Sequence, residues 1–407
     1  MINLYPYLNN PAIDSVVMFP NGFKAGKLYT VYPRFGFFNA SRDLTAYRTI
    51  NSTTVPTFKY LDLQGVDVPL CDYEYSTCPE LFIQKESFNY FLNTSDFAAV
   101  NWNTNGTITD LYGQGPNLMP FSAARFQNAN AYQITDFGGP YLTLSVYAKR
   151  NTASTIRLYQ DTAEVTYTLS DSWERYTFTT TPGGPCDIGF EVVGDALIWT
   201  PQFEEGDFAT SPITNGATEN IRPKDIIYKD ITGREEFLMY FDVRLRSGAN
   251  IDDFYEVIGS VNAGDTDYYC AIGVSNTNDF IVNLYNNPDN QLEVFSAYPD
   301  GIHKVAVKFT DSVVKVWIDG VNVLESGNVG VSPTALNRLD LGTIAGALNP
   351  IKDRIRGSIF MGGVAGTLPT DEEIIELTTI TDAAEYMITQ GGDFILSESG
   401  DYIILEQ

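Results

Sequence analysis

Residues 141–149 read Tyr-Leu-Thr-Leu-Ser-Val-Tyr-Ala-Lys, and this alternation decides the fold class of the chain. The apolar residues occupy every second position: Leu142, Leu144, Val146 and Ala148. Side chains at that spacing share one face of a β-strand, because successive residues point to opposite sides. The segment therefore predicts a strand with one face in a hydrophobic core.

The same alternation extends in both directions. Strands recur at roughly ten-residue spacing and are separated by turn sequences at residues 151–154 and 182–185, which predicts an antiparallel jelly roll over residues 86–220. A second alternating region predicts a sandwich over residues 225–380. It holds a hairpin turning at residues 310–312 and a short helix at about 371–378.

The two ends of the chain differ from these regions. Residues 1–85 are rich in Pro, Asn and Tyr, which predicts an irregular region that docks on a partner. In the tail, 381–407, Gly-Asp-Phe-Ile-Leu-Ser-Glu at 392–398 is echoed by Gly-Asp-Tyr-Ile-Ile-Leu-Glu at 400–406, which predicts two short strands. We therefore expect an all-β chain: an irregular N-terminal docking region, two antiparallel β-sandwich (jelly-roll) domains and a short β tail.

Charge and composition exclude several classes of protein. Lys and Arg total 25 against 51 Asp and Glu, so the net charge is −26, and no clustered cations are present to replace the counterions of nucleic acid. No apolar window is long enough for a membrane-spanning helix, and no signal peptide precedes the first strands. We expect synthesis in a cytoplasm, no nucleic-acid partner and no membrane insertion. Cys71 and Cys78 are expected to be free thiols, with a short bridge as the alternative.

Several motifs resemble those of bacteriophage structural proteins. Val-Pro-Leu-Cys-Asp-Tyr at 68–73 is similar to a Pro-Arg-x-Asp-Tyr opening motif, with Leu70 in place of the Arg. The 141–149 strand, Trp-Glu-Arg-Tyr at 173–176 and the run 202–211 (Gln-Phe-Glu-Glu-Gly, then Phe-Ala-Thr-Ser) resemble the carbohydrate-binding-module-like jelly roll of tail-fibre and head-fibre proteins. Residues 235–380 resemble a concanavalin A-like or laminin G-like sandwich. The resemblance implies a virion protein, made in the host bacterial cytoplasm, whose partners are other virion proteins.

Catalytic patterns are missing from the sequence. Glycan hydrolases built on sandwiches of the second kind use carboxylates spaced Glu-x-Asp-x-x-Glu, a spacing that is absent here. The adjacent pairs at 235–236 and 372–373 are interpreted as solvated or helix-capping groups. With a single His, His303, neither a His-based triad nor a typical zinc site is expected. We therefore predict that the chain is not an enzyme and needs no cofactor.

Candidate glycan contacts lie on outward strand faces. If Leu142, Leu144 and Val146 point inward, Tyr147 points outward, and the pattern gives Arg157 and Tyr159 the same direction. A flat ring beside a guanidinium suits a pyranose, and the alternative is a patch covered in an oligomer. Tyr268 and Tyr285 are further candidates of this kind. Trp173, Trp199 and Trp317 are expected to serve packing.

An acidic loop offers a second kind of site. Asp252, Asp253, Asp265 and Asp267 could supply oxygen ligands to Ca²⁺, although turn formation is the commoner role of clustered Asp.

These observations favour a virion appendage protein, a tail or head fibre, that forms a homo-oligomer, expected to be a trimer, and grips a host cell-surface glycan through many weak contacts. The alternatives are a purely architectural virion protein and a cell-made surface adhesin.

Overall fold

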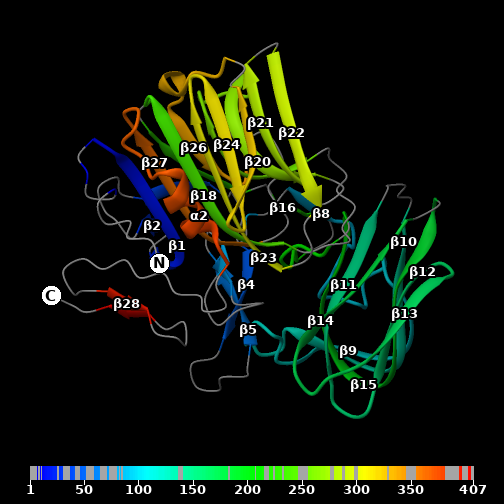
Figure 1. Ribbon diagram of the computed structural model, residues 1–407. Helices are drawn as coiled ribbons and strands as arrows, with labels where there is room; N and C mark the ends of the chain where they lie inside the picture. Colours follow the sequence, from blue (N-terminus) through cyan, green and yellow to red (C-terminus); the bar gives the residue numbers. More distant parts are fainter. Residues whose placement is uncertain are drawn as a thin grey trace.

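The computed structural model describes most of the chain between residues 7 and 404. The residues outside the description are 1–6, 8–9, 11, 25–26, 31–36, 42–45, 52–58, 65–70, 73–79, 82, 84–85, 136–140, 182–183, 207, 215–219, 223–224, 232, 246–254, 276–278, 287–288, 298–300, 328–329, 345–353, 381–393, 397–401 and 405–407. The described part is almost entirely antiparallel β-structure and forms two β-rich lobes (Figure 1). Within it, no helix has the length and hydropathy needed to cross a membrane.

The first lobe is the predicted jelly-roll sandwich. Its strands are β8 (Ser87–Asn89), β9 (Asn103–Gly113), β10 (Ala123–Thr135), β11 (Leu142–Arg150), β12 (Thr155–Gln160), β13 (Ala163–Thr168), β14 (Glu174–Thr180), β15 (Cys186–Glu205) and β16 (Asn220–Arg222). They are ordered β13-β12-β15-β10-β9, with β11 placed between β15 and β14. The predicted inward set of β11, Leu142 to Ala148 at every second residue, is buried in one core.

Strand β15 is the longest element of this lobe and connects its two halves. Its residues 188–193 pair with β12, and its residues 196–205 pair with β11, while β10 runs along its other edge from residue 186 to 198. The inward residues of β15 alternate as well, with Ile188, Phe190 and Val192 fully buried. One continuous strand therefore supports the whole core.

Aromatic rings fill one end of this core. The centroid of the Phe97 ring lies 5.0 Å from those of Trp102 and Phe126, and Phe126 lies 5.3 Å from Phe190. The indole nitrogen of Trp102 donates to the Asn93 carbonyl oxygen at 3.0 Å. Trp102 is thus satisfied inside the lobe and serves packing.

A buried carboxylate fastens the end of the lobe. Glu204 is fully buried on the outer side of β15 and accepts from the Thr210 backbone N–H at 2.8 Å, from the Thr210 and Ser87 hydroxyls at 2.5 Å each, and from Gln202 at 2.5 Å. A buried carboxylate is tolerated only where several donors replace its water. The run 202–211, the most specific motif of the sequence, is therefore a structural clasp.

The second lobe is a two-layered sandwich. Its elements are β17 (Ile226–Asp230), β18 (Glu236–Leu245), β19 (Tyr255–Asn262), β20 (Tyr268–Ser275), β21 (Asp279–Asn286), β22 (Asp289–Ala297), β23 (Gly301–Thr310), β24 (Val313–Ile318), β25 (Val321–Gly327), the 3₁₀-helix η1 (Pro333–Ala335), β26 (Arg338–Leu341), β27 (Arg354–Gly363) and α2 (Asp371–Thr378). Met239 and Phe241 of β18 face the core between the layers, and Tyr240 faces the opposite side beneath α2. The alternation predicted for this strand is confirmed.

Local signals of the second lobe are also confirmed. Strands β23 and β24 form the predicted hairpin, and the following turn places Asp319 and Gly320 at φ +50° and +82°, the left-handed pair of a tight hairpin turn. Helix α2 begins at Asp371 with a capping box in which Thr370 and Glu373 bond each other's backbone N–H groups. Beneath this helix, Trp317 is fully buried, which confirms its predicted packing role.

The N-terminal region contains the strands β1 (Asp14–Lys24), β2 (Lys27–Thr30), β3 (Phe37–Ser41), β4 (Ala46–Asn51), β5 (Lys59–Gln64), β6 (Cys71–Asp72) and β7 (Glu80–Leu81). Strands β1, β3 and β7 pair with the second lobe, whereas β4 and β5 pair with each other as a separate two-stranded sheet. Strand β1 runs antiparallel to β27, and β3 runs antiparallel to β17. The docking of this region on a partner stays a prediction. The thiol of Cys71 and the whole of Cys78 lie outside the described residues.

The terminal repeat forms the two predicted strands. They are β28 (Phe394–Leu396) and β29 (Tyr402–Ile404), which pair with each other antiparallel. Two strands of this length are marginal in water without further support.

We expect Glu204→Ala to destabilise the first lobe by about 3 kcal/mol, because the hydroxyl and N–H donors it satisfies would be left buried without an acceptor. Urea unfolding followed by tryptophan fluorescence measures this change. The matched control is Glu205→Ala, since the next residue is exposed and should change stability by no more than about 0.5 kcal/mol. Equal effects of the two substitutions would refute the clasp.

Candidate functional site

A register shift between β10 and β15 directs polar side chains outward from the first lobe. The register of β10 against β15 shifts between Gln127 and Ala129. At this level Gly194 has φ +107° and Asn128 has φ +43°, and the Gly194 N–H donates to the Asn128 side-chain oxygen at 2.9 Å. Such a bulge adds a residue to one strand and turns its neighbours. As a result, Asp195 stands on the outer face opposite Gln127.

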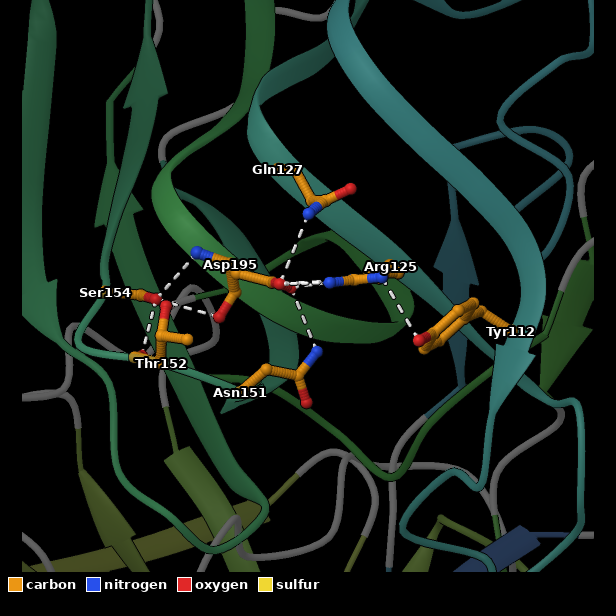
Figure 2. Close-up of polar contacts among 7 residues, drawn as sticks. All are labelled: Tyr112, Arg125, Gln127, Asn151, Thr152, Ser154 and Asp195. Atoms are coloured by element: carbon orange, nitrogen blue, oxygen red, sulfur yellow. Dashed lines mark hydrogen bonds and ion pairs between the residues drawn. The ribbon is translucent and has the colours of Figure 1, made fainter.

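Asp195 is the centre of a polar cluster on that face (Figure 2). Arg125 donates to it through Nε at 2.9 Å and through Nη2 at 2.5 Å, a two-pronged pairing. Asn151 donates to Oδ1 at 3.0 Å, and Gln127 donates to Oδ2 at 3.3 Å. Two strands and one turn, far apart in sequence, therefore meet at one carboxylate.

The turn that carries Asn151 is fixed by the backbone of Asp195. The N–H groups of Asn151 and Thr152 donate to the Asp195 carbonyl oxygen at 2.9 and 3.2 Å. The hydroxyl of Ser154 accepts from the Asp195 N–H at 3.0 Å (Figure 2). The amide of Asn151 is consequently held in place before any ligand arrives.

Tyr112 adds an exposed ring to the cluster. Its hydroxyl accepts from Nη1 of Arg125 at 3.1 Å, and the guanidinium carbon lies 4.9 Å from the ring centroid. The residue remains 46% exposed, so an aromatic surface is offered to solvent beside a fixed guanidinium. Rings presented in this way contribute stacking area at little conformational cost.

Electrostatics hold Asp195 in its charged form. The hydrogen bond from Arg125 is the main cause that lowers the pKa of the Asp195 carboxyl, and its partial burial opposes this effect. The same bond raises the pKa of Arg125. The pair therefore stays ionised at neutral pH.

A group of aromatic and apolar side chains lies on the same outer face, around Trp199 of β15. Trp199 is buried, and its ring centroid lies 5.6 Å from that of Tyr147 on the paired strand β11. Trp173, Leu197 and Ala123 complete this group. Trp199 thus serves packing, as predicted, but outside the main core of the lobe.

The loop between β9 and β10 closes over this group and exposes apolar side chains. Leu118, Met119 and Phe121 are 42%, 51% and 66% exposed, and both Leu118 and Phe121 have positive φ. The hydroxyl of Ser122 bonds the Met119 carbonyl and the Asn117 side chain. Non-glycine residues in this conformation cost free energy and persist only where the surroundings hold them. These hydrogen bonds hold the loop in a conformation that leaves the three apolar side chains at the surface.

The sequence-predicted residues of the first lobe are not gathered into one site. Tyr147 is half-buried between Trp199 and the guanidinium of Arg175, which lies 5.3 Å from its ring centroid. Arg157 and Tyr159 lie together on β12, with the guanidinium carbon 4.8 Å from the ring centroid. Arg157 also pairs with Glu164 and Glu191 at 2.7 and 2.6 Å.

Tyr159 is outward by alternation but only 8% exposed. Burial raises the pKa of its hydroxyl to about 12. This ring is therefore covered rather than displayed.

In the second lobe, Tyr268 and Tyr285 make contacts that stabilise the fold. The Tyr268 hydroxyl donates to the Gly330 carbonyl at 3.1 Å and accepts from the Ser332 N–H. The ring of Tyr285 stacks on that of Tyr269 with centroids 5.4 Å apart.

The acidic loop forms a turn where it is described. Asp265 accepts from the N–H groups of Asp267 and Tyr268 at 3.0 and 3.1 Å, the turn-forming role named above. Asp252 and Asp253 lie outside the described residues. Among the residues that are described, no three His, Cys, Asp or Glu side chains gather as metal ligands.

Tyr112, Arg125, Asn151 and Asp195 were not predicted from the sequence. A partial signal exists, since Ala124 and Phe126 point inward and thereby direct Arg125 outward. The Gly194–Asp195 pair within a long strand also marks a bulge. Their convergence depends on strand pairing, which the sequence does not display.

Comparison with known proteins finds likeness only among solved structures. No protein-family model matches the chain, and no curated protein matches it. The chain is similar to the CBM40 module of the Ruminococcus gnavus IT-sialidase bound to α2,3-sialyllactose, with 16% identity over 36% of this chain and 84% of that chain (TM-score 0.31). It is also similar to domain 4 of a GH43 extracellular arabinanase from Geobacillus stearothermophilus in complex with arabinotriose, with 16% identity over 38% and 73% (TM-score 0.31).

The chain is also similar to a structure whose description says that cell entry of botulinum neurotoxin type C depends on interaction with two ganglioside molecules. The identity is 15% over 38% of this chain and 39% of that chain (TM-score 0.30). The site in this chain has to be judged from its own residues.

The Asp195 ion pair should stabilise the lobe in a pH-dependent way. Because Arg125 lowers the pKa of Asp195 in the folded state, the contribution is present above the unfolded value, about 3.9, and is lost as the pH falls through the lower folded pKa. We expect the stability difference between the native chain and Asp195→Asn, measured by urea unfolding, to be constant from pH 7 to about pH 5 and to shrink as the pH falls below the unfolded pKa, about 3.9. A difference that grows on acidification would contradict the pairing.

Proposed function

We propose that the chain is a non-catalytic, glycan-binding structural protein of a bacteriophage appendage. We further propose that it contacts the glycan with the outer face of the first lobe, at the site formed by Tyr112, Arg125, Gln127, Asn151 and Asp195, named here the Asp195 site. One observation carries the proposal. The exposed ring of Tyr112 lies beside Arg125, and hydrogen bonds to the Asp195 carboxylate hold Arg125 and Asn151 in place.

The chemistry of this site matches that of a sugar ring. A pyranose has an apolar face of C–H groups that stacks on an aromatic ring and a rim of hydroxyls that both donate and accept hydrogen bonds. Tyr112 offers the ring, Asp195 accepts, and the guanidinium of Arg125 donates. Because these groups already bond one another, little side-chain freedom would be lost on binding.

The placement in a phage particle is supported by motifs in the sequence. The run 202–211 is the most specific of them, and its residues Gln202, Glu204 and Thr210 form the clasp described above. In a particle, one weak site per subunit would be multiplied over many copies, and the linked sites would bind far more tightly than one alone.

The absence of catalysis is part of the proposal. The acidic pairs found in the sequence have structural partners: Glu236 accepts from the N–H groups of Thr367 and Leu368 at 2.9 and 3.0 Å, and Glu373 caps α2. His303 is buried and bonded to Asp319 at 2.7 Å. Carboxylates occupied in this way support a binding role.

A purely architectural role is the second candidate. The exposed apolar residues of the loop 114–122 favour it, because an apolar loop suits a contact with another virion protein.

Substitutions at the Asp195 site test the two roles. We expect Tyr112→Ala to weaken glycan binding several-fold by removing stacking worth about 0.5–1.5 kcal/mol, and Arg125→Ala to weaken it at least as much. Binding to purified host-surface glycans, measured by surface plasmon resonance on the full chain, gives the comparison. The matched control is Arg157→Ala. This substitution removes a guanidinium of β12 that is likewise paired with carboxylates, those of Glu164 and Glu191.

Arg157→Ala should leave glycan binding unchanged. If Arg157→Ala weakens binding and Arg125→Ala does not, the contact surface lies on β12. If neither the native chain nor any variant binds host glycans, the architectural role is the better one.

We propose that the chain forms a homotrimer, since the terminal hairpin of β28 and β29 is too short to be stable unsupported. Analytical ultracentrifugation of the full chain at micromolar concentration should give about three times the mass of one chain. Removal of residues 390–407 should lower the melting temperature by several degrees. A stable monomer would contradict the proposal.

A further inference from the structure

We propose that the Asp195 site selects uncharged pyranoses and rejects acidic ones such as sialic or uronic acids. The inference rests on the proposed function and adds the chemical class of the ligand. It follows from the charge state of the groups that line the site and from the hydrogen-bonding capacity they have left.

The only cation of the site is already neutralised. Nε and Nη2 of Arg125 both bond Asp195, and Nη1 bonds the Tyr112 hydroxyl. Asp195 occupies the Nε/Nη2 face of the guanidinium, and the Tyr112 hydroxyl takes one N–H of Nη1 on the other face. An acidic sugar would therefore have to share a guanidinium whose charge Asp195 already compensates.

Three further Arg side chains in the described part of the lobe are also engaged. Arg150 pairs with Asp171, whose pKa Lys149 lowers further, and Arg157 pairs with Glu164 and Glu191. Arg175 donates to the Thr210 carbonyl and to the Ser145 hydroxyl, the latter at 2.9 Å. Since the whole chain has a net charge of −26, long-range attraction of an anion is absent as well.

The site keeps acceptors as well as donors for a sugar hydroxyl. Asn151 and Gln127 each donate to Asp195 through the amide N–H₂ group, which turns their carbonyl oxygens toward other partners. Hydroxyl groups can donate to such oxygens and to the carboxylate, whereas a sugar carboxylate has no proton to give. A site with these acceptors, whose cation is already compensated by Asp195, thus fits hydroxyls better than an anion.

Matched sugar pairs test this selectivity. Titration calorimetry and saturation-transfer NMR on the full chain, in 150 mM salt, would use the methyl glycosides of glucose and glucuronic acid, those of galactose and galacturonic acid, and lactose against sialyllactose. We expect one or more neutral members to bind and each corresponding acid to bind at least about tenfold more weakly. Tyr112→Ala should weaken the binding of the neutral sugar several-fold.

The outcomes separate the inference from the proposed function. If an acidic member binds as tightly as its neutral partner and Tyr112→Ala weakens that binding, glycan binding at this site stands and the selectivity is wrong. If no member of any pair binds, the proposed function fails and the inference fails with it. Binding that Tyr112→Ala does not alter would place the glycan elsewhere and would also overturn the inference.

A charge substitution tests the preference for neutral sugars independently. Asp195→Asn removes the negative charge and frees the guanidinium of Arg125, so the preference for the neutral over the acidic sugar should fall at least about threefold. Asp187→Asn, an exposed acidic residue on the same strand β15, makes the same change in net charge and should leave the preference unaltered. Thermal melting of both variants confirms folding. An unchanged preference in a folded Asp195→Asn variant would refute the inference.

Discussion

The pairing of strand β15 with three neighbours is the constraint on which the first lobe depends. Its backbone hydrogen bonds tie β10, β11 and β12 into one structure, and its inward residues supply the centre of the core. The register of β15 against β10 shifts beside Gly194, and such a bulge bends the strand and increases its local twist. Beyond the shift, Asp195 lies on the outer surface opposite Gln127, so the strand that supplies the core also carries the centre of the polar site.

Two carboxylates on this strand show how surroundings assign a role. Glu204 is fully enclosed and its acceptor capacity is taken up by Thr210, Ser87 and Gln202, so it contributes to stability and has nothing left to offer a ligand. Asp195 is held just as firmly, by Arg125, but lies at the surface with amide oxygens beside it. Burial and spare hydrogen-bonding capacity, rather than residue type, separate a clasp from a candidate binding group.

The outer face of the lobe is covered unevenly, and this pattern limits where a ligand could be bound. On β11, Thr143 and Ser145 point outward yet are fully buried, and Thr143 donates to the Gly206 carbonyl at 2.7 Å. On β12, Arg157 lies over the ring of Tyr159. Around Tyr112 the face stays open, and an apolar loop borders it. An open aromatic surface beside fixed polar groups is what distinguishes this part of the lobe.

The sequence by itself determined the strands of the two sandwich regions, the inward faces of β11 and β18, the Asp319–Gly320 turn and the capped helix α2, because period-two alternation, turn residues and caps act over a few neighbouring residues. It did not predict that β1 and β3 pair with the second lobe. It also indicated that Tyr159 points outward, but only the tertiary structure decided that the ring is covered, since alternation gives a direction and says nothing about what lies above. Likewise, Tyr112, Arg125 and Asp195 are separated by up to 83 positions in the chain, and strand pairing alone brings them together. Long-range pairing of this kind depends on the register of whole strands, which no local pattern encodes.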